Sequence, residues 1–336
     1  MAAAPSSFGT IAVMGGGSWA TALASLLMRR CERIVWYMRR DDRIADFRRL
    51  RHNPVYVSDI VFDVDRIGFT SDINAACSDA DTLLLVMPSP YFKSHADKIT
   101  VPLAGKTVIS AVKGIVPDEN LTVTDYMESH FGVDPQATLA ISGPCHAEEI
   151  ALGRRSYLTA ACRDSRRAAD LAAMLTGGNV SAVPSADIEG VEYAAVLKNV
   201  YAIAAGMVHG LNAGDNFLAV LVSNAIREME RFLAAQCPGH IRNICDSAYL
   251  GDLLVTCYSR FSRNHNFGSI IGRGYSVKAA RMEMEQTAEG YFGTKCIHEI
   301  NAVTGVDMPL LDGVYDILYR GAPAADTLRR VSESFS

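Results

Sequence analysis

Short apolar runs alternate with glycine-bearing and polar segments over the first half of the chain. The first run, Ile11–Met14, is followed by three glycines and then by Leu23, Leu26 and Leu27 at helical spacing. Later runs are continuously apolar, as expected of strands buried on both faces of a parallel sheet. The pattern predicts a strand at 11–14 and further strands at 33–38, 81–87, 106–112, 138–142, 157–162 and 179–183.

The pattern changes after about Asp187, where long helical repeats replace the strand signals. Residues 188–209 and 217–235 predict two long helices, and the helical pattern continues to the end of the sequence. A chain of 336 residues is also long for one hydrophobic core. We therefore expect an α/β fold in which a doubly wound sheet domain over residues 1–187 precedes an all-α domain over residues 188–336.

The three glycines fit the dinucleotide-binding fingerprint G-x-G-x-x-(G/A), read over residues 15–20. In this motif Gly15 makes the tight turn, Gly17 lets the backbone approach a pyrophosphate, and Ala20 lets the helix pack close to the strand. The N–H groups and positive dipole end of the helix then face the anion. An ordinary strand-to-helix turn is the alternative, but the flanking strand and helix favour dinucleotide binding. We therefore expect residues 1–187 to form a Rossmann-like dinucleotide-binding domain and residues 188–336 to form the substrate-binding domain.

The end of the second predicted strand bears on the choice of cofactor. Folds that prefer NAD usually place an acidic residue about 20 residues after the glycines, where it bonds the ribose 2′-hydroxyl. This chain has Arg39 and Arg40 there, and acids follow only at Asp41 and Asp42. The arginines suit the 2′-phosphate of NADPH, although a solvated surface pair explains them equally well.

Composition and charge narrow the classes of function. Hydrophobic residues make up 49% and charged residues 21% of the chain, as in ordinary soluble globular proteins. The net charge of −5 provides no basic field for nucleic acid or an anionic membrane surface. Any anionic ligand must therefore be held by local cations.

The eight cysteines contain no C-x-x-C pair, which argues against a zinc site and a disulfide framework. Free thiols fit a reducing cytosol. The first ten residues lack the pattern of a signal peptide, and no run of about 20 apolar residues is present to span a bilayer. We expect a cytoplasmic protein without a membrane span or a metal.

Several predicted strands end in loops rich in glycine, proline or lysine. Such loops lie at the carboxyl edge of a parallel sheet, where ligands bind. The strand at 106–112 leads into Lys113, and the strand at 138–142 leads into Gly143, Cys145 and His146. Hydride transfer needs no covalent nucleophile, so Cys145 is interpreted as lining a pocket and His146 as a surface or packing residue.

Two segments of the helical half carry candidate chemistry. Lys198 lies on a predicted helix face of small apolar residues, where a charge is costly and the neutral form of a general base is favoured. Ser262, Arg263 and Asn264 supply a hydroxyl, a planar five-donor fork and an amide, a set that suits a phosphate monoester. Each has a plainer explanation: Lys198 extends past the alanines to water, and Ser262 caps a helix.

Nine short motifs occur in a fixed order along the chain. They are the fingerprint at 15–20 with Leu23, then 53–56 (NPVY), 86–89 (VMPS), Lys113-Gly114, Ser142-Gly143-Pro144 with Ala147 and Glu148, 198–200 (KNV), 250–252 (LGD), 262–264 (SRN) and 289–291 (EGY). Over nearly the whole chain, this series closely resembles the bacterial NAD(P)-dependent glycerol-3-phosphate dehydrogenases.

The resemblance implies a role for each matching residue. Lys198 corresponds to the proton acceptor at the C2 hydroxyl, and Lys113 and Arg263 would contact both ligands. The implied substrate contacts are Lys113, Gly143, Cys145, Lys198, Asp252, Ser262, Arg263 and Asn264. The implied cofactor contacts are Gly15, Gly17, Ser18, Trp19, Arg39, Lys113, Ala147, Arg263, Thr287 and Glu289.

The implied activity is that of an oxidoreductase: reversible hydride transfer between sn-glycerol 3-phosphate and NAD(P)+, giving dihydroxyacetone phosphate. Reduction would dominate in the cell and supply glycerol 3-phosphate for phospholipid synthesis. NADPH use is expected, and so is a homodimer. Two departures from the family are Ala20, which the fingerprint tolerates, and Cys145, where Ser or Thr is usual.

Two other functions stay open from the sequence alone. One is a two-domain dehydrogenase of the same architecture that acts on a 3-hydroxy acid or a phosphorylated sugar acid. The other is a catalytically idle cofactor sensor. The intact Lys198, Asp252 and Arg263 argue against the sensor.

Overall fold

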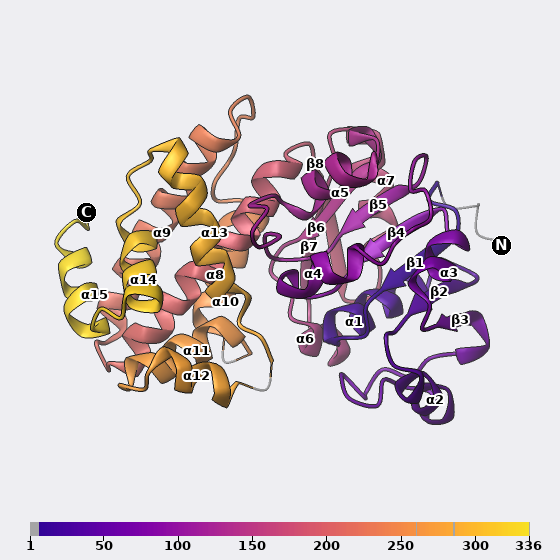
Figure 1. Cartoon of the computed structure of the whole chain (residues 1–336), viewed down its shortest axis with the longest axis horizontal. Helices are drawn as coiled ribbons and strands as arrows, with labels where there is room; N and C mark the ends of the chain where they lie inside the picture. The colour runs from indigo at the N-terminus through magenta and orange to yellow at the C-terminus, as the bar shows by residue number, and fades with distance from the viewer. Residues whose placement is uncertain (1–6, 260, 285, 336) are drawn as a thin grey trace. The chain divides into compact units, whose positions relative to one another are not determined.

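The computed structural model describes residues 7–259, 261–284 and 286–335 (Figure 1). The chain forms two compact units, which are described separately. Unit 1 contains the residues up to Val112 together with Val123–Ile188, and unit 2 contains Lys113–Thr122 and the chain from Glu189 onward. The domain division after residue 187 stays a prediction.

Unit 1 is built around an eight-stranded sheet in the order β3-β2-β1-β4-β5-β6-β7-β8. All neighbouring strands are parallel except β6 and β7, which are antiparallel. The strands are β1 (Ile11–Met14), β2 (Ile34–Tyr37), β3 (Ile67–Thr70), β4 (Thr82–Leu85), β5 (Thr107–Ser110), β6 (Thr138–Ser142), β7 (Ser156–Ala161) and β8 (Val180–Ser185). This doubly wound topology confirms the predicted fold class.

Helices connect successive strands and flank the sheet (Figure 1). They are α1 (Ser18–Leu27), α2 (Asp41–Leu50), α3 (Ile73–Ser78), α4 (Ser89–Ala96), α5 (Val123–Phe131), α6 (Ala147–Ala151) and α7 (Ser165–Leu175), with short 3₁₀ turns η1 (Val64–Arg66) and η2 (Pro135–Ala137). Strands β1, β2, β4 and β5 are buried along their whole length, as the continuous apolar runs predicted.

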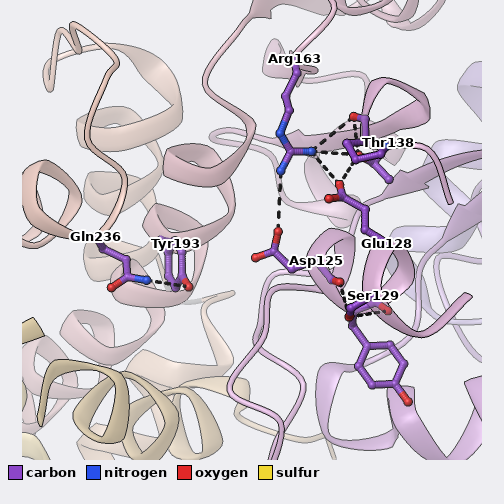
Figure 2. Close-up of polar contacts among 9 residues, drawn as sticks. Asp125, Glu128, Ser129, Thr138, Arg163, Tyr193 and Gln236 are labelled. Carbon is purple, nitrogen blue, oxygen red and sulfur yellow. Dashed lines mark hydrogen bonds and ion pairs between the residues drawn. The ribbon is translucent and has the colours of Figure 1, made fainter. Parts of the chain in front are cut away.

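A polar cluster fastens α5 to the strands of the second half of the sheet (Figure 2). The Arg163 guanidinium, just after β7, lies 2.6 Å from Glu128 Oε1 and 3.7 Å from Asp125 Oδ1 on α5. The Thr138 hydroxyl at the start of β6 donates to the same Glu128 oxygen at 2.6 Å. The side chains of Arg163, Asp125 and Glu128 are partly buried, so their ion pairs are screened less than exposed ones.

Unit 2 is helical, as predicted for the second half of the chain. Its helices are α8 (Ile188–Gly210), α9 (Asp215–Gln236), α10 (Asp252–Tyr258), α11 (Arg263–Gly272), α12 (Val277–Glu283), α13 (Glu289–Thr304), α14 (Pro309–Arg320) and α15 (Ala324–Ser332), and a π-helical turn η3 (Ser247–Gly251) precedes α10. The Gln236 amide donates to the Tyr193 hydroxyl at 3.4 Å and joins the end of α9 to α8 (Figure 2).

Helix α8 is the core helix of unit 2. It is long and apolar enough to cross a membrane, yet its most apolar stretch is entirely buried inside the protein. Its backbone lies directly against α11: a Cβ added at Gly206 would meet the His265 carbonyl at 2.0 Å, and one at Gly268 would meet the Ile203 carbonyl at 2.0 Å. Small residues allow such an approach of two helix backbones.

Candidate active site

The glycine turn between β1 and α1 has the features of a phosphate-binding loop. Gly15 has a φ of 141°, and a Cβ there would meet the Val86 carbonyl at 2.4 Å, so only glycine fits. In contrast, a Cβ added at Gly17 would meet nothing within 4 Å, which leaves open space over the loop. The first turn of α1, with Ser18 and Trp19, contains no acidic residue that would oppose an anion. These residues fit a dinucleotide pyrophosphate.

The two arginines after β2 differ in their surroundings. Arg40 is bonded to Asp42, with Nε donating to Oδ1 at 2.9 Å. Arg39 is exposed and makes no hydrogen bond or ion pair with the described residues. The surface-pair explanation therefore holds for Arg40, whereas Arg39 is available to a 2′-phosphate.

The loop after β6 carries the other predicted residues of unit 1. Gly143 has a φ of 111°, and a Cβ there would lie 2.8 Å from the Tyr157 carbonyl. The Cys145 thiol is buried and donates to the Gly143 carbonyl at 3.1 Å. Ala147 begins α6 and is also buried. Cys145 thus closes a local turn, and its interpretation as a pocket-lining residue stays a prediction.

In unit 2, two predicted lysines lie against the carboxylate of a third predicted residue, Asp252. The Lys198 ammonium on α8 donates to Asp252 Oδ1 at the start of α10. Lys113 Nζ lies 3.5 Å from Asp252 Oδ2. The side chain of Asp252 is 1% exposed, that of Lys198 4% and that of Lys113 18%. We call these three residues the Lys198–Asp252–Lys113 triad, in which Lys198 and Asp252 are buried and Lys113 is partly exposed.

The triad corrects one expectation from the sequence. We predicted that a helix face of small apolar residues would favour the neutral form of Lys198. The neighbours Val191, Ala194, Ala195 and Ala202 are indeed buried. The prediction did not include a carboxylate, however, and the Asp252 carboxylate that is bonded to Lys198 favours the ammonium form. Lys198 is therefore arranged to hold a proton.

Two residues that the sequence did not mark as functional position the triad. The Thr256 hydroxyl, one turn after Asp252 on α10, donates to the Asp252 carbonyl at 2.6 Å and lies 3.4 Å from Oδ1. The Asn199 amide donates to the Lys113 carbonyl at 2.8 Å. The D-x-x-x-T spacing at 252–256 is a signal that could have identified Thr256, because residues four apart share a helix face.

The segment at 262–264 begins α11. The Ser262 hydroxyl accepts from the His265 N–H at 3.2 Å, so the helix-cap explanation holds, and its own hydrogen stays available to donate. Arg263 is exposed and donates to Gln286 Oε1 at 3.2 Å. The buried Asn264 accepts from the Gly290 N–H at 2.9 Å.

These bonds join the start of α11 to the start of α13. Thr287 lies just before α13, and Glu289 is its first residue. Unit 2 therefore holds Lys113, Lys198, Asp252, Ser262, Arg263, Asn264, Thr287 and Glu289. Unit 1 holds Gly15, Gly17, Ser18, Trp19, Arg39, Gly143, Cys145 and Ala147. Among the described residues, no group of three or more His, Cys, Asp or Glu side chains is placed to hold a metal ion.

Comparisons with known proteins cover nearly the whole chain. The N-terminal model of NAD-dependent glycerol-3-phosphate dehydrogenase matches residues 10–168, and the C-terminal model matches residues 187–329. A glycerol-3-phosphate dehydrogenase (NAD(P)+) of Prosthecochloris aestuarii is 32% identical over 95% of this chain and 96% of its own. That of Bacillus subtilis is 31% identical over 93% of this chain and 90% of its own.

A solved structure agrees with these matches. The crystal structure of glycerol-3-phosphate dehydrogenase from Coxiella burnetii is 27% identical, covers 96% of this chain and 98% of its own, and superposes with a TM-score of 0.87. Family models, relatives and fold thus agree from end to end, and the chain belongs to the NAD-dependent glycerol-3-phosphate dehydrogenase family.

Proposed function

We propose that the Lys198–Asp252–Lys113 triad performs the proton chemistry of the family's reaction. That reaction is reversible hydride transfer between sn-glycerol 3-phosphate and NAD(P)+, which gives dihydroxyacetone phosphate. The bound nicotinamide supplies or accepts the hydride. The protein's part is to bind and orient the substrate and to move one proton at its C2 oxygen.

Lys198 is the proton carrier in this proposal. During reduction its ammonium donates a proton to the C2 oxygen as negative charge develops there, and during oxidation the neutral amine takes the proton back. Asp252 fixes the ammonium and favours the charged form required for reduction. The single observation that carries the proposal is this buried lysine held by a buried carboxylate.

The ligand contacts implied by the family remain proposals for this chain. In unit 2, Ser262, Arg263, Asn264 and Lys113 supply donors and positive charge for the substrate phosphate, and Asp252 is a further implied substrate contact. In unit 1, the implied substrate contacts are Gly143 and Cys145. The cofactor contacts that the family implies are Gly15, Gly17, Ser18, Trp19, Arg39 and Ala147 among the residues of unit 1, and Lys113, Arg263, Thr287 and Glu289 among those of unit 2. The open loop over Gly17 and the unpaired Arg39 support the contacts in unit 1.

The decisive experiment is single-turnover reduction of dihydroxyacetone phosphate by Lys198→Ala with saturating substrate and NADPH. We expect the rate to fall by about 10²–10⁴, the usual range for general acid–base catalysis. Small alkylamines added in solution should restore part of the rate. Lys295→Ala removes an exposed lysine that is paired with Asp118 and Glu299, and it should react at the wild-type rate. A near-wild-type rate for Lys198→Ala would assign the proton to another group.

Arg263→Ala separates binding from chemistry. The phosphate contact is made in the ground state and in the transition state, so its loss should raise KM for dihydroxyacetone phosphate more than it lowers kcat. A smaller loss of kcat should follow, because the phosphate also orients the reacting carbon. If kcat alone fell, Arg263 would act in the transition state instead.

Family membership displaces the two alternative functions. The matched relatives are named for glycerol 3-phosphate, not for a 3-hydroxy acid or a sugar acid, and the complete triad argues against an idle sensor. We propose that the enzyme acts in the cytoplasm as a homodimer, with reduction supplying glycerol 3-phosphate for phospholipid synthesis.

A further inference from the structure

Three consecutive carbonyl groups of the glycine turn each accept a hydrogen bond from a side chain. The Trp36 indole N–H donates to the Gly15 carbonyl at 2.6 Å. The Asn53 amide donates to the Gly16 carbonyl at 3.1 Å, and the Thr21 hydroxyl donates to the Gly17 carbonyl at 3.0 Å. The donors come from β2, from the loop after α2 and from α1, so three separate segments hold this short turn.

Asn53 is the centre of this arrangement. It is 1% exposed and uses its whole hydrogen-bonding capacity. Its Nδ2 also donates to the Thr21 hydroxyl at 2.8 Å, and its Oδ1 accepts from the N–H groups of Val55 at 3.0 Å and Tyr56 at 3.1 Å. The oxygen thus closes the turn at 53–56, while the nitrogen reaches the glycine turn.

Fixing the carbonyls also fixes the N–H groups of the same peptide units. None of the described peptide bonds is cis, so each carbonyl and the following N–H point in opposite directions. The N–H groups of Gly16, Gly17 and Ser18 therefore point away from Trp36, Asn53 and Thr21. No hydrogen bond from these three N–H groups to another described residue is present. Successive N–H groups of a turn that are left to donate are the kind of group that binds anions.

We propose that Asn53 is a positioning residue for the cofactor, which aims the N–H groups of the glycine turn at the pyrophosphate. The proposal rests on the cofactor position given under Proposed function. Because Asn53 is buried beneath the turn, it acts only through the carbonyls that it holds. Asparagine suits this position because it combines two donors with an acceptor that takes two bonds; aspartate lacks the donors, and leucine lacks both.

Asn53→Asp tests the donor side by itself, because its carboxylate can still accept from Val55 and Tyr56. Binding of NADPH without substrate is measured by calorimetry, and the Kd should rise about tenfold, since one buried carbonyl loses its donor. Saturating NADPH should restore kcat to the wild-type value, and KM for dihydroxyacetone phosphate should not change, because only uniform cofactor binding is lost. Thr21→Val removes the hydroxyl that links Asn53 to Gly17 and should show the same pattern, even if Asn53→Asp folds poorly.

Two further variants separate the possible failures. Asn301 is also buried and closes a turn through bonds to both backbone groups of Val306, so Asn301→Ala should lower stability and leave the Kd for NADPH unchanged. Gly17→Val fills the open space over the turn without touching the protein and should abolish binding. If Gly17→Val still binds NADPH, the proposed cofactor position is wrong.

The role of Asn53 is overturned by either of two results when Gly17→Val behaves as expected. One is an unchanged Kd in both Asn53→Asp and Thr21→Val. The other is a loss of kcat that saturating NADPH does not restore, which would indicate general damage to the fold.

Discussion

Replacing Asp252 by asparagine should leave the charge of Lys198 without a counter-charge in the interior of unit 2. The two side chains have nearly the same shape, but asparagine carries no charge. Lys198, with 4% of its side chain exposed, would lose its counter-charge, whereas Lys113, with 18% exposed, can turn toward water. The energetic consequence should therefore come mainly from Lys198.

The magnitude follows from the burial of this pair. Removing one partner of a buried ion pair costs about 3–5 kcal/mol, because the other charge stays desolvated. Loss of the partly exposed pair between Asp252 and Lys113 should add about 1 kcal/mol or less to this cost. We expect Asp252→Asn to lower the free energy of unfolding of unit 2 by about 3–5 kcal/mol near pH 6. The loss should shrink as the pH rises, because the folded variant then holds Lys198 neutral and binds fewer protons than its unfolded chain.

The assay uses a natural feature of the chain. Both tryptophans, Trp19 and Trp36, lie in unit 1, so their fluorescence reports unfolding of that unit, while far-ultraviolet circular dichroism also reports the helices of unit 2. Urea unfolding of Asp252→Asn should shift the dichroism transition and leave the fluorescence transition in place. Asp326→Asn, which breaks an exposed pair with Arg329, should cost less than about 1 kcal/mol.

A double-mutant cycle gives the result that would refute this reasoning. Lys198→Met removes the charge that Asp252→Asn leaves without a partner. The double variant should therefore lose clearly less free energy of unfolding than the sum of the losses in the two single variants. Additive losses, or a single-variant loss below about 1 kcal/mol, would mean that Lys198 and Asp252 do not form a buried ion pair in solution.

Two further predictions concern cofactor choice and pH. Arg39→Ala should lower the ratio of kcat/KM for NADPH to kcat/KM for NADH by about tenfold, the order expected for a lost charge-assisted hydrogen bond. Arg40→Ala should leave this ratio unchanged, because Arg40 is bonded to Asp42. Equal ratios in the two variants would exclude Arg39 as a contact of the 2′-phosphate. Burial raises the pKa of Glu228, whose oxygens accept from the N–H groups of Leu310 and Leu311, to about 7. The folded protein therefore binds this proton more tightly than the unfolded chain, and stability should fall by roughly 3 kcal/mol as the pH rises from about 4.5 through 7. Glu228→Gln should remove that part of the pH dependence in urea titrations; an unchanged pH profile would show that Glu228 is already ionised below this range.

The sequence predicted those parts of the fold that depend on local patterns. The apolar runs marked β1, β2 and β4–β8 to within about two residues, and the long apolar pattern marked α8. Strand β3 was missed because it contains Gly68, lies at the sheet edge and is mostly half-buried, so it lacks the continuous apolar signal of the central strands.

The missed parts of the site are long-range. Lys198 and Asp252 are 54 positions apart in the chain, and no periodicity within either segment indicates that they meet. The sequence marked both as ligand contacts but not as partners, and this omission led to the wrong charge environment for Lys198. The bond from Asn53 to Gly16 spans 37 positions and was missed for the same reason.

Backbone contacts at glycines explain how the helices of unit 2 hold the proposed site residues at fixed distances from one another. Lys198 lies on α8, the segment at 262–264 begins α11, and Glu289 begins α13. Helix α8 touches α11 through Gly206 and Gly268, and it touches α13 at Gly290, where a Cβ would lie 2.5 Å from the Asn199 carbonyl.

A side chain at any of these glycines must push two helix backbones apart, because the opposing atoms are carbonyl groups and not flexible side-chain ends. The separation between the proposed catalytic lysine and the proposed phosphate-binding residues is therefore set by main-chain contact. Hydride and proton transfer depend on such placement, since a displacement of about 1 Å can cost about 100-fold in rate.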